Sequence, residues 1–202
     1  MTDPDLPQPL DERALDRLFH KARTMNGYLD RPVDEAILHR IWDLVRMGPT
    51  SANQLPARLI WCRTRDARDR LADCVSAGNA DKIRNAPVSV IIAMDLDFHE
   101  QLPWLFPHDD ARSWFADDEE ARAQSAFRNS TLQGGYFIMA ARALGLDCGP
   151  MSGFDADKIC AQFLADQPRW HPNFISTLGY GDMSSTFARS PRPDFDVFNT
   201  IL

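Results

Sequence analysis

The fold of this chain is decided by the stretch EEARAQSAFRNSTLQGGYFIMAARALGLDCGPMSGFD, residues 119–155. Its first part is polar, but from Leu132 to Leu144 it is apolar almost all round, which is typical of a buried helix. Gly134 and Gly135 lie inside this helix, where glycine costs about 1 kcal/mol per residue relative to alanine. That cost indicates that another helix or a flat ligand approaches the backbone there.

The end of the same stretch has the features of a loop that the helix delivers. Gly145 is suited to end the helix, and a short segment, Leu146–Cys148, leads into a turn over Gly149–Gly153. Asp155 is placed to cap a further helix. We therefore predict a long central helix that brings a rigid loop to a functional site.

The composition favours one domain with a substantial core. The chain has 202 residues, of which 44% are hydrophobic, and a formal net charge of −7. We expect a disordered arm over residues 1–9 and a single domain over residues 10–202. The negative charge argues against nucleic acid or an anionic membrane as a partner. The longest apolar run, Val88–Met94, is far too short to span a bilayer.

The cysteines indicate a reducing compartment. Cys62, Cys74, Cys148 and Cys160 form no C-x-x-C pair, so neither a zinc site nor a thioredoxin motif is predicted. Scattered single cysteines fit the cytosol, and the acidic, proline-rich start of the chain is unlike a secretory signal peptide. We expect a cytoplasmic protein without a metal site.

Hydrophobic periodicity predicts the remaining elements. Helices are expected over residues 11–23, 32–47, 66–76 and 155–165, and strands over residues 58–62, 88–94 and 174–180. The strand at 88–94 is continuous and β-branched, as in the centre of a sheet. In the second helix the residues expected in the core are Ile37, Ile41, Leu44 and Val45. The last residues, 195–202, are apolar enough to pack on another surface, such as a partner subunit.

Two basic segments have both an ordinary and a functional interpretation. Residues 23–28, RTMNGY, are either a helix exit or a phosphate grip, because an arginine beside a hydroxyl at a turn suits both. Arg189 and Arg192 are either solvated or part of a phosphate site. Neither alternative is excluded by the residues alone.

Two amide-rich segments likewise have both an ordinary and a functional interpretation. Residues 48–53, GPTSAN, are either a plain turn or a set of hydroxyls and amides that face a heterocycle. Asn79 and Lys82 share a helical face, for which surface polarity is the simpler explanation.

Residues 97–116, DFHEQLPWLFPHDDARSWFA, combine aromatic side chains with charges and two prolines. Such a segment is a candidate lid over a pocket. The alternative is a loop folded onto the core with its charges solvated. Arg112 is the charge suited to clamp a carboxylate with two parallel hydrogen bonds, and His108 is a candidate because it lies in the same segment.

No motif supplies the chemistry directly. The chain has no G-x-G-x-x-G, no Walker loop and no G-x-S-x-G elbow, and its five histidines show no metal-ligand spacing. It offers arginines, amide-rich loops and a buried helix without an obvious nucleophile. This combination suits a protein whose cofactor carries the chemistry.

Several segments make the chain resemble the nitroreductase family of FMN flavoproteins over nearly its whole length. Residues 23–28, followed by Pro32-Val33, are similar to the N-terminal phosphate motif of that family, and residues 49–53 resemble its flavin-edge loop. Residues 143–155 resemble the helix end and loop that face the reactive edge of the flavin. Residues 188–192 resemble its C-terminal basic segment.

The resemblance implies an α+β fold, with a mostly antiparallel sheet flanked by helices and a long buried central helix. It also implies an intertwined homodimer that binds FMN at two interface sites, with NADH or NADPH as the hydride donor. The residues implied at the FMN phosphate and ribityl chain are Arg23, Thr24, Arg189 and Arg192. Those implied at the ring, from the partner subunit, are Pro49, Thr50, Ser51 and Asn53. The polar ring edge is assigned to Asn79, and the N5 edge to Pro150, Met151, Ser152 and Gly153, with backbone N–H groups from the last two.

Two positions depart from the family pattern. Asn26, also implied at the cofactor, stands where relatives often have a basic residue that stabilises the reduced flavin. That role would fall to Lys82 or Arg58. Ser152 stands where some relatives have a glutamate.

The likeness is closest to members of the family that reduce malonic semialdehyde to 3-hydroxypropanoate in pyrimidine degradation. It rests on residues 48–53, 105–108, 110–115, 126–130 and 144–155. It implies a ping-pong reaction in which NAD(P)H and then the small-molecule substrate exchange hydride with FMN.

In this interpretation Arg112 would bind the substrate carboxylate, and His108 or a backbone N–H would polarise the aldehyde or supply the proton. One alternative is a broad NAD(P)H nitroreductase or quinone reductase that uses the same pocket without a carboxylate clamp. Another is a flavin-binding module without turnover, which the asparagine at position 26 would favour.

Overall fold

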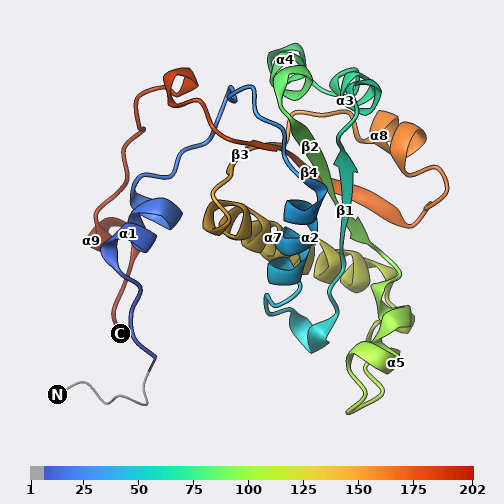
Figure 1. Cartoon of the computed structure of the whole chain (residues 1–202). Helices are drawn as coiled ribbons and strands as arrows, with labels where there is room; N and C mark the ends of the chain where they lie inside the picture. The colour runs from blue at the N-terminus through green and yellow to red at the C-terminus, as the bar shows by residue number, and fades with distance from the viewer. Residues whose placement is uncertain (1–6) are drawn as a thin grey trace.

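A four-stranded antiparallel sheet forms the centre of the protein, shown in Figure 1 as a computed structural model that describes residues 7–202. The strand order is β1-β2-β4-β3, with β1 at Ala57–Cys62, β2 at Val88–Asp95, β3 at Asp147–Met151 and β4 at Trp170–Gly179. The expected antiparallel sheet with flanking helices is confirmed. Most of the predicted arm, residues 1–6, lies outside the described residues, and residues 7–9 are exposed and without regular structure.

Helices cover both faces of this sheet. The helices of the described residues are α1 at Glu12–Leu15, α2 at Glu35–Val45, α3 at Arg65–Ala72, α4 at Ala77–Asn85, α5 at Leu102–Leu105, α6 at Ser113–Ala116, α7 at Glu119–Ala143, α8 at Ala156–Phe163 and α9 at Phe195–Phe198. Shorter turns are the π-helical η1 at Asp16–His20 and the 3-10 turns η2 at Ser51–Asn53, η3 at Phe98–Gln101 and η4 at Met183–Ser185. The predicted cap of α8 is confirmed, because Asp155 Oδ1 accepts from Lys158 N at 3.1 Å.

β2 is the central strand because its sequence, VSVIIAMD, is apolar on both faces. Val90 and Ile92 lie in one apolar cluster with α2 and α7. Ile91 and Ala93 lie in a second cluster with α3, α4 and α8. The sheet is therefore the middle of three layers, which a strand without a polar face requires.

α7 is the long central helix that the sequence predicts, but it is not buried on every side. Phe137 is fully buried against the first cluster. Phe127, Leu132 and Tyr136 remain 53%, 48% and 42% exposed, and they line a cavity of about 980 Å³ along the helix. Within one chain the sheet and α2 cover only one side of α7, so its second apolar side faces outward.

Two further expectations about helices are corrected. The first helical segment ends at His20 rather than Arg23, because Thr24 already pairs in extended conformation with Cys148 of β3. In α2, Leu38 is buried, whereas Leu44 is 42% exposed. The helical repeat turns Leu44 away from the sheet.

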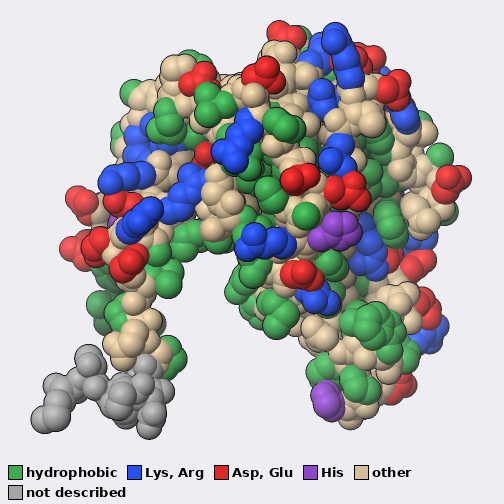
Figure 2. Space-filling model, in the orientation of Figure 1, with side chains coloured by type: hydrophobic (Ala, Val, Ile, Leu, Met, Phe, Trp, Pro, Cys, Tyr) green, Lys and Arg blue, Asp and Glu red, His purple; other side chains and the backbone are tan. Residues whose placement is uncertain are grey.

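The two ends of the described chain lie together, away from the sheet. Figure 1 shows α9 beside α1, and Figure 2 shows a hollow, bordered by hydrophobic side chains, between this segment and the main body. The apolar residues near the C-terminus are all exposed: Phe187, Phe195, Val197, Phe198, Ile201 and Leu202. The predicted packing of residues 195–202 is therefore not made on the sheet of the same chain.

Candidate active site

Residues 19–26 and residues 187–192 meet around a basic cavity of about 520 Å³. Arg23, Thr24 and Asn26 line it from the segment after η1, and Arg189 and Arg192 line it from the C-terminal segment. Figure 1 shows these two segments, one blue and one red, side by side. The structure thus brings together the two basic segments whose role the sequence did not decide.

Hydrogen bonds to the backbone fix these arginines. Arg189 Nη2 donates to His20 O and Ala22 O, both at 2.9 Å, and Arg23 Nη2 donates to Phe187 O. Arg142 also lines the cavity, and sequence reasoning missed it because it belongs to the last turn of α7. Each guanidinium has five N–H donors, so donors remain for a ligand. No acidic side chain of the described chain lines the cavity, and this donor set fits a phosphate group.

β3 leads from this cavity to a second polar group. Thr24 forms a parallel bridge with Cys148 at the start of the strand. From Cys148 to Gly153 the extended backbone covers about 16 Å. At the far end, Asn79 Nδ2 donates to Gly153 O at 3.4 Å. The structure therefore brings Asn79 to the predicted loop, at the opposite end of β3 from the arginines.

The predicted turn over Gly149–Gly153 is wrong in its first part, because β3 continues through Pro150 to Met151. β3 is an edge strand, where a proline without an N–H is tolerated. A Cβ at Gly149 would lie 2.6 Å from Met25 O, so the close approach of the two segments requires glycine. Ser152 and Gly153 follow the strand, and within residues 7–202 their backbone N–H groups have no acceptor.

The loop after α2 has an unusual backbone. Ala52, Asn53 and Leu55 have positive φ angles of 48°, 49° and 40°, a region that non-glycine residues adopt at a cost. Thr50 Oγ1 accepts from Leu55 N at 3.2 Å, and Asn53 Nδ2 donates to Leu105 O at 2.8 Å.

The same loop holds the predicted ring contacts Pro49, Thr50, Ser51 and Asn53, but the structure does not bring them to the basic cavity of the same chain. Figure 1 shows η2, in cyan, at the end of the molecule away from β3. Nothing within the described chain joins the two groups directly.

Residues 97–116 fold into η3, α5 and α6 rather than an open loop. Phe98, Leu102 and Ala111 are buried in a third apolar cluster with Ala126 of α7. The position of this segment agrees with the interpretation of a loop folded onto the core. His108 is exposed at its tip, with its ring 5.5 Å from that of Phe106.

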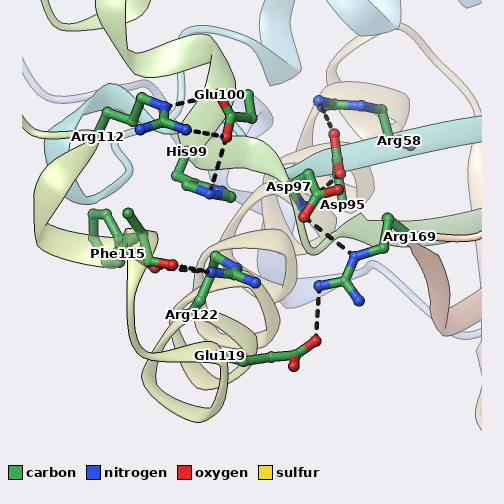
Figure 3. A network of polar contacts seen from close by, with 11 residues as sticks. Arg58, Asp95, Asp97, His99, Glu100, Arg112, Phe115, Glu119, Arg122 and Arg169 are labelled. Atoms are coloured by element: carbon green, nitrogen blue, oxygen red, sulfur yellow. Dashed lines mark hydrogen bonds and ion pairs between the residues drawn. The ribbon is translucent and has the colours of Figure 1, made fainter.

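The charges around this segment are paired rather than simply solvated, as Figure 3 shows. Arg112 Nε and Nη2 donate to the carboxylate of Glu100 at 2.8 and 2.7 Å. This hydrogen-bonded pairing lowers the pKa of Glu100. Arg169 bridges Asp97, at 3.2 Å, and Glu119, at 2.8 Å. The predicted substrate clamp, Arg112, therefore already binds a carboxylate.

A buried pair lies behind these surface charges. Arg122 is 8% exposed and donates to Phe115 O at 2.9 Å and Ala116 O at 3.1 Å, which ties α6 to α7. His99 is also buried, and its Nδ1 has no hydrogen-bond partner in the described structure. Burial, and then the charge of Arg122, lower the pKa of His99.

Of the two basic residues considered as substitutes at the cofactor, only one is free. Arg58 Nη2 binds Asp95 Oδ2 at 2.6 Å and its guanidinium lies over the Trp170 ring. Lys82 has no ion pair among the residues that the structure describes, and it lies three residues after Asn79 in α4. The free positive charge is therefore next to the ring-edge end of the site.

The described residues offer little for metal binding or for catalysis by a cysteine nucleophile. Residues 7–202 contain no group of three His, Cys, Asp or Glu that could hold a metal ion. No helix over that range is long and apolar enough to cross a membrane. Burial raises the pKa of the Cys148 thiol to about 12, which makes it a poor nucleophile, since the thiolate is the reactive form.

Comparison with known proteins is consistent across sequence and structure. The nitroreductase family matches residues 20–180. A protein of Ralstonia nicotianae named "Putative NADH dehydrogenase/NAD(P)H nitroreductase" is 55% identical over 187 residues, which are 93% of this chain and 95% of that protein. A "putative nitroreductase" structure from Bacillus subtilis superposes with a TM-score of 0.84 at 19% identity, covering 95% of this chain and 100% of that one. Another, in complex with FMN and from Exiguobacterium sibiricum, gives a TM-score of 0.81 at 16% identity, covering 96% and 99%.

Proposed function

This chain belongs to the nitroreductase family, and from that premise we propose that it is an FMN-dependent NAD(P)H oxidoreductase. The observation that carries the proposal is the basic cavity, which β3 joins to the contact between Asn79 and Gly153. The two ends carry the donors that a flavin mononucleotide needs, arginines for its phosphate and amide groups for its polar ring. When bound, FMN supplies hydride transfer between a reduced nicotinamide and a second substrate.

Different residues of the chain would bind different parts of this cofactor. The arginines of the cavity would bind the phosphate by charge-assisted hydrogen bonds, with Thr24 and Asn26 beside them. The N–H groups of Ser152 and Gly153, which have no acceptor in residues 7–202, would face the reactive edge of the ring. Lys82 would supply the positive charge that Asn26 lacks.

A homodimer would complete the site. The loop 49–53 lies away from the basic cavity of its own chain, so a second copy is needed to bring it to the ring. Two exposed apolar surfaces support this proposal: the outer side of α7 with Leu132, and the C-terminal segment. We expect Leu132→Asp to give a monomer that binds FMN weakly in sedimentation and titration experiments. Leu29→Asp is the matched control, since Leu29 is 53% exposed outside both surfaces.

We propose malonic semialdehyde as the second substrate, with its carboxylate on Arg112 and its aldehyde near His108. Arg112 already shows the two-pronged geometry that such a carboxylate requires, on Glu100. Both side chains are exposed, and an exposed ion pair contributes little to stability because water screens its charges. A substrate carboxylate can therefore exchange with Glu100 at small cost.

A broad nitroreductase or quinone reductase activity is the second candidate. The ion pair between Arg112 and Glu100 favours this activity, because Glu100 neutralises the charge of Arg112. A neutral nitroarene has no carboxylate for Arg112 to bind. The two candidates share the cofactor and the pocket. They differ in whether Arg112 contributes to the second half-reaction.

An anaerobic experiment tests the proposal. The purified protein should show a flavin spectrum that NADH or NADPH bleaches, and malonic semialdehyde should restore the blue absorbance faster than a nitroarene or a quinone. Absence of bound flavin, or of bleaching, would contradict the oxidoreductase. Recovery only with the nitroarene or quinone would move the function to the broad reductase.

Substitution at Arg112 separates the two candidates further. Arg112→Ala should raise the KM for malonic semialdehyde by about ten- to a hundredfold, because a hydrogen-bonded charge is lost. The rate with a nitroarene should stay unchanged. Arg65→Ala, at an exposed arginine of α3, is the matched control. An unchanged KM in Arg112→Ala would remove Arg112 from the proposal.

A further inference from the structure

Buried amide groups hold the strained loop after α2. Asn129 of α7 is 3% exposed, and its Oδ1 accepts a hydrogen bond from Ser51 N at 2.9 Å. Its Nδ2 donates to Ser125 O at 2.9 Å, so the side chain presents its oxygen to the loop. Gln54, at the end of the loop, is fully buried and its side-chain amide meets the Ser125 hydroxyl at 3.0 Å.

The loop needs such a restraint because its backbone is unfavourable by itself. Ala52, Asn53 and Leu55 all have positive φ angles, and each of these non-glycine residues would relax toward extended or right-handed backbone if released. The Asn129 bond acts on Ser51, immediately before the first of the three. No glycine stands within residues 50–55 to remove the cost.

The other side of the loop is tied to the segment 97–116. Asn53 Nδ2 donates to Leu105 O at 2.8 Å, at the end of α5. The loop is therefore fixed between two bodies, α7 on the buried side and α5 on the outer side. A displacement of Ser51 would move the side chain of Asn53 and its contact with Leu105.

We propose that Asn129, backed by Ser125, is a positioning residue for the flavin-edge loop. It holds the strained backbone so that the hydroxyl and amide groups of residues 50–53 meet the FMN bound by the partner subunit. This inference rests on the proposed function, because it assumes that the loop faces the flavin. Within residues 7–202 the side chain of Asn129 makes hydrogen bonds to the loop and to its own helix alone.

The test measures FMN affinity in three forms of the full-length protein. Fluorescence titration of the apoprotein with FMN should show binding weakened on the order of tenfold in Asn129→Ala, since the buried Ser51 N–H loses its acceptor. Adding Ala52→Gly, which removes the cost of a positive φ, should restore much of the affinity. A loss that came only from a weakened helix would not respond to a glycine in the loop.

Asn173→Ala is the matched control. Asn173 of β4 donates to Ser130 Oγ at 2.8 Å and Thr131 Oγ1 at 2.9 Å on the same helix, with no hydrogen bond to the loop. It should lower thermal stability while leaving FMN affinity within about twofold of the wild type. If Asn129→Ala does not fold, Ser125→Ala, which favours the helix, replaces it and should also weaken FMN binding.

Two results would overturn this inference and leave the proposed function standing. The first is wild-type FMN affinity in Asn129→Ala, or in Ser125→Ala where that variant replaces it. The second is no recovery of FMN affinity when Ala52→Gly is added. Hydrogen exchange adds a reading that needs no flavin, because the amides of Ser51 and Asn53 should exchange faster in Asn129→Ala. A wild-type protein that binds no FMN would overturn the proposed function and this inference together. The wild-type titration therefore separates the two failures.

Discussion

Gly134→Ala tests how closely β4 packs on the central helix. A Cβ at Gly134 would lie 2.3 Å from Phe174 Cε1 and 2.5 Å from Phe174 Cζ, whereas a Cβ at Gly135 would meet nothing within 4 Å. Both glycines lie in α7, one residue apart, so Gly135→Ala is a matched control. The two substitutions differ mainly in the ring of Phe174.

The expected magnitude follows from two opposing effects. Alanine should favour the helix by about 1 kcal/mol at either position. At Gly134 the added methyl group must displace the partly buried ring of Phe174, and such overpacking costs about 1–3 kcal/mol. The helix preference is common to both, so the difference in the free energy of unfolding should equal the overpacking cost, with Gly134→Ala less stable.

Thermal unfolding followed by circular dichroism measures this difference. In a chain of this size 1 kcal/mol shifts Tm by about 2–4 °C. Both variants are compared at one protein concentration, because Gly135 lies on the side of α7 proposed to meet a second copy. Adding Phe174→Leu should recover stability only in Gly134→Ala. Equal Tm values for the two alanine variants would refute the packing argument.

The remaining predictions concern titration, thiol reactivity and the anchoring of α6. The lowered pKa of His99 means that the unfolded chain binds a proton below about pH 6.5 that the folded protein resists. The free energy of unfolding should therefore fall from pH 6.5 downward, and His99→Leu should reduce that slope in urea titrations. Burial raises the pKa of Cys62 and Cys148 to about 12, so Ellman's reagent should react first with the half-exposed Cys160 and reach these two only after denaturation; fast labelling of Cys148 in the native protein would contradict its placement. Arg122→Met should lower stability by about 1–3 kcal/mol in urea unfolding, because two carbonyls of the α6 segment lose their donor, whereas Arg65→Met on the surface should stay within about 0.5 kcal/mol of the wild type.

Local patterns were enough to predict several elements of the fold. The β-branched run at 88–94 lies in the central strand, and Asp155 caps α8. Both are decided within a few residues, by side-chain shape and by one hydrogen bond to a nearby N–H. The polar segments around Arg23 and Arg189 were recognised for the same reason, since their chemistry is carried by the residues themselves.

Elements that depend on distant partners were not decided by the sequence. Gly149 and Pro150 were predicted as a turn, but they pair with β4 and so belong to a strand, and Met25 N donates to Cys148 O in the same strand. The outward side of α7 also carries apolar residues, among them Phe127, Leu132 and Tyr136, and its exposure depends on where the sheet and α2 pack. One of the two interpretations of residues 97–116 left their charges solvated, but the structure pairs Asp97 with Arg169.

The site shows the same division. The side chains that can bind a phosphate, an amide edge or a carboxylate could be identified before folding was considered, because that capacity belongs to each residue's chemistry. Three arrangements required the folded protein: Arg23 and Arg189 share a cavity, Glu100 pairs with Arg112, and Asn129 holds the strained loop. The physical reason is that these contacts join residues far apart in the chain, and their position depends on how the whole core packs rather than on any local pattern.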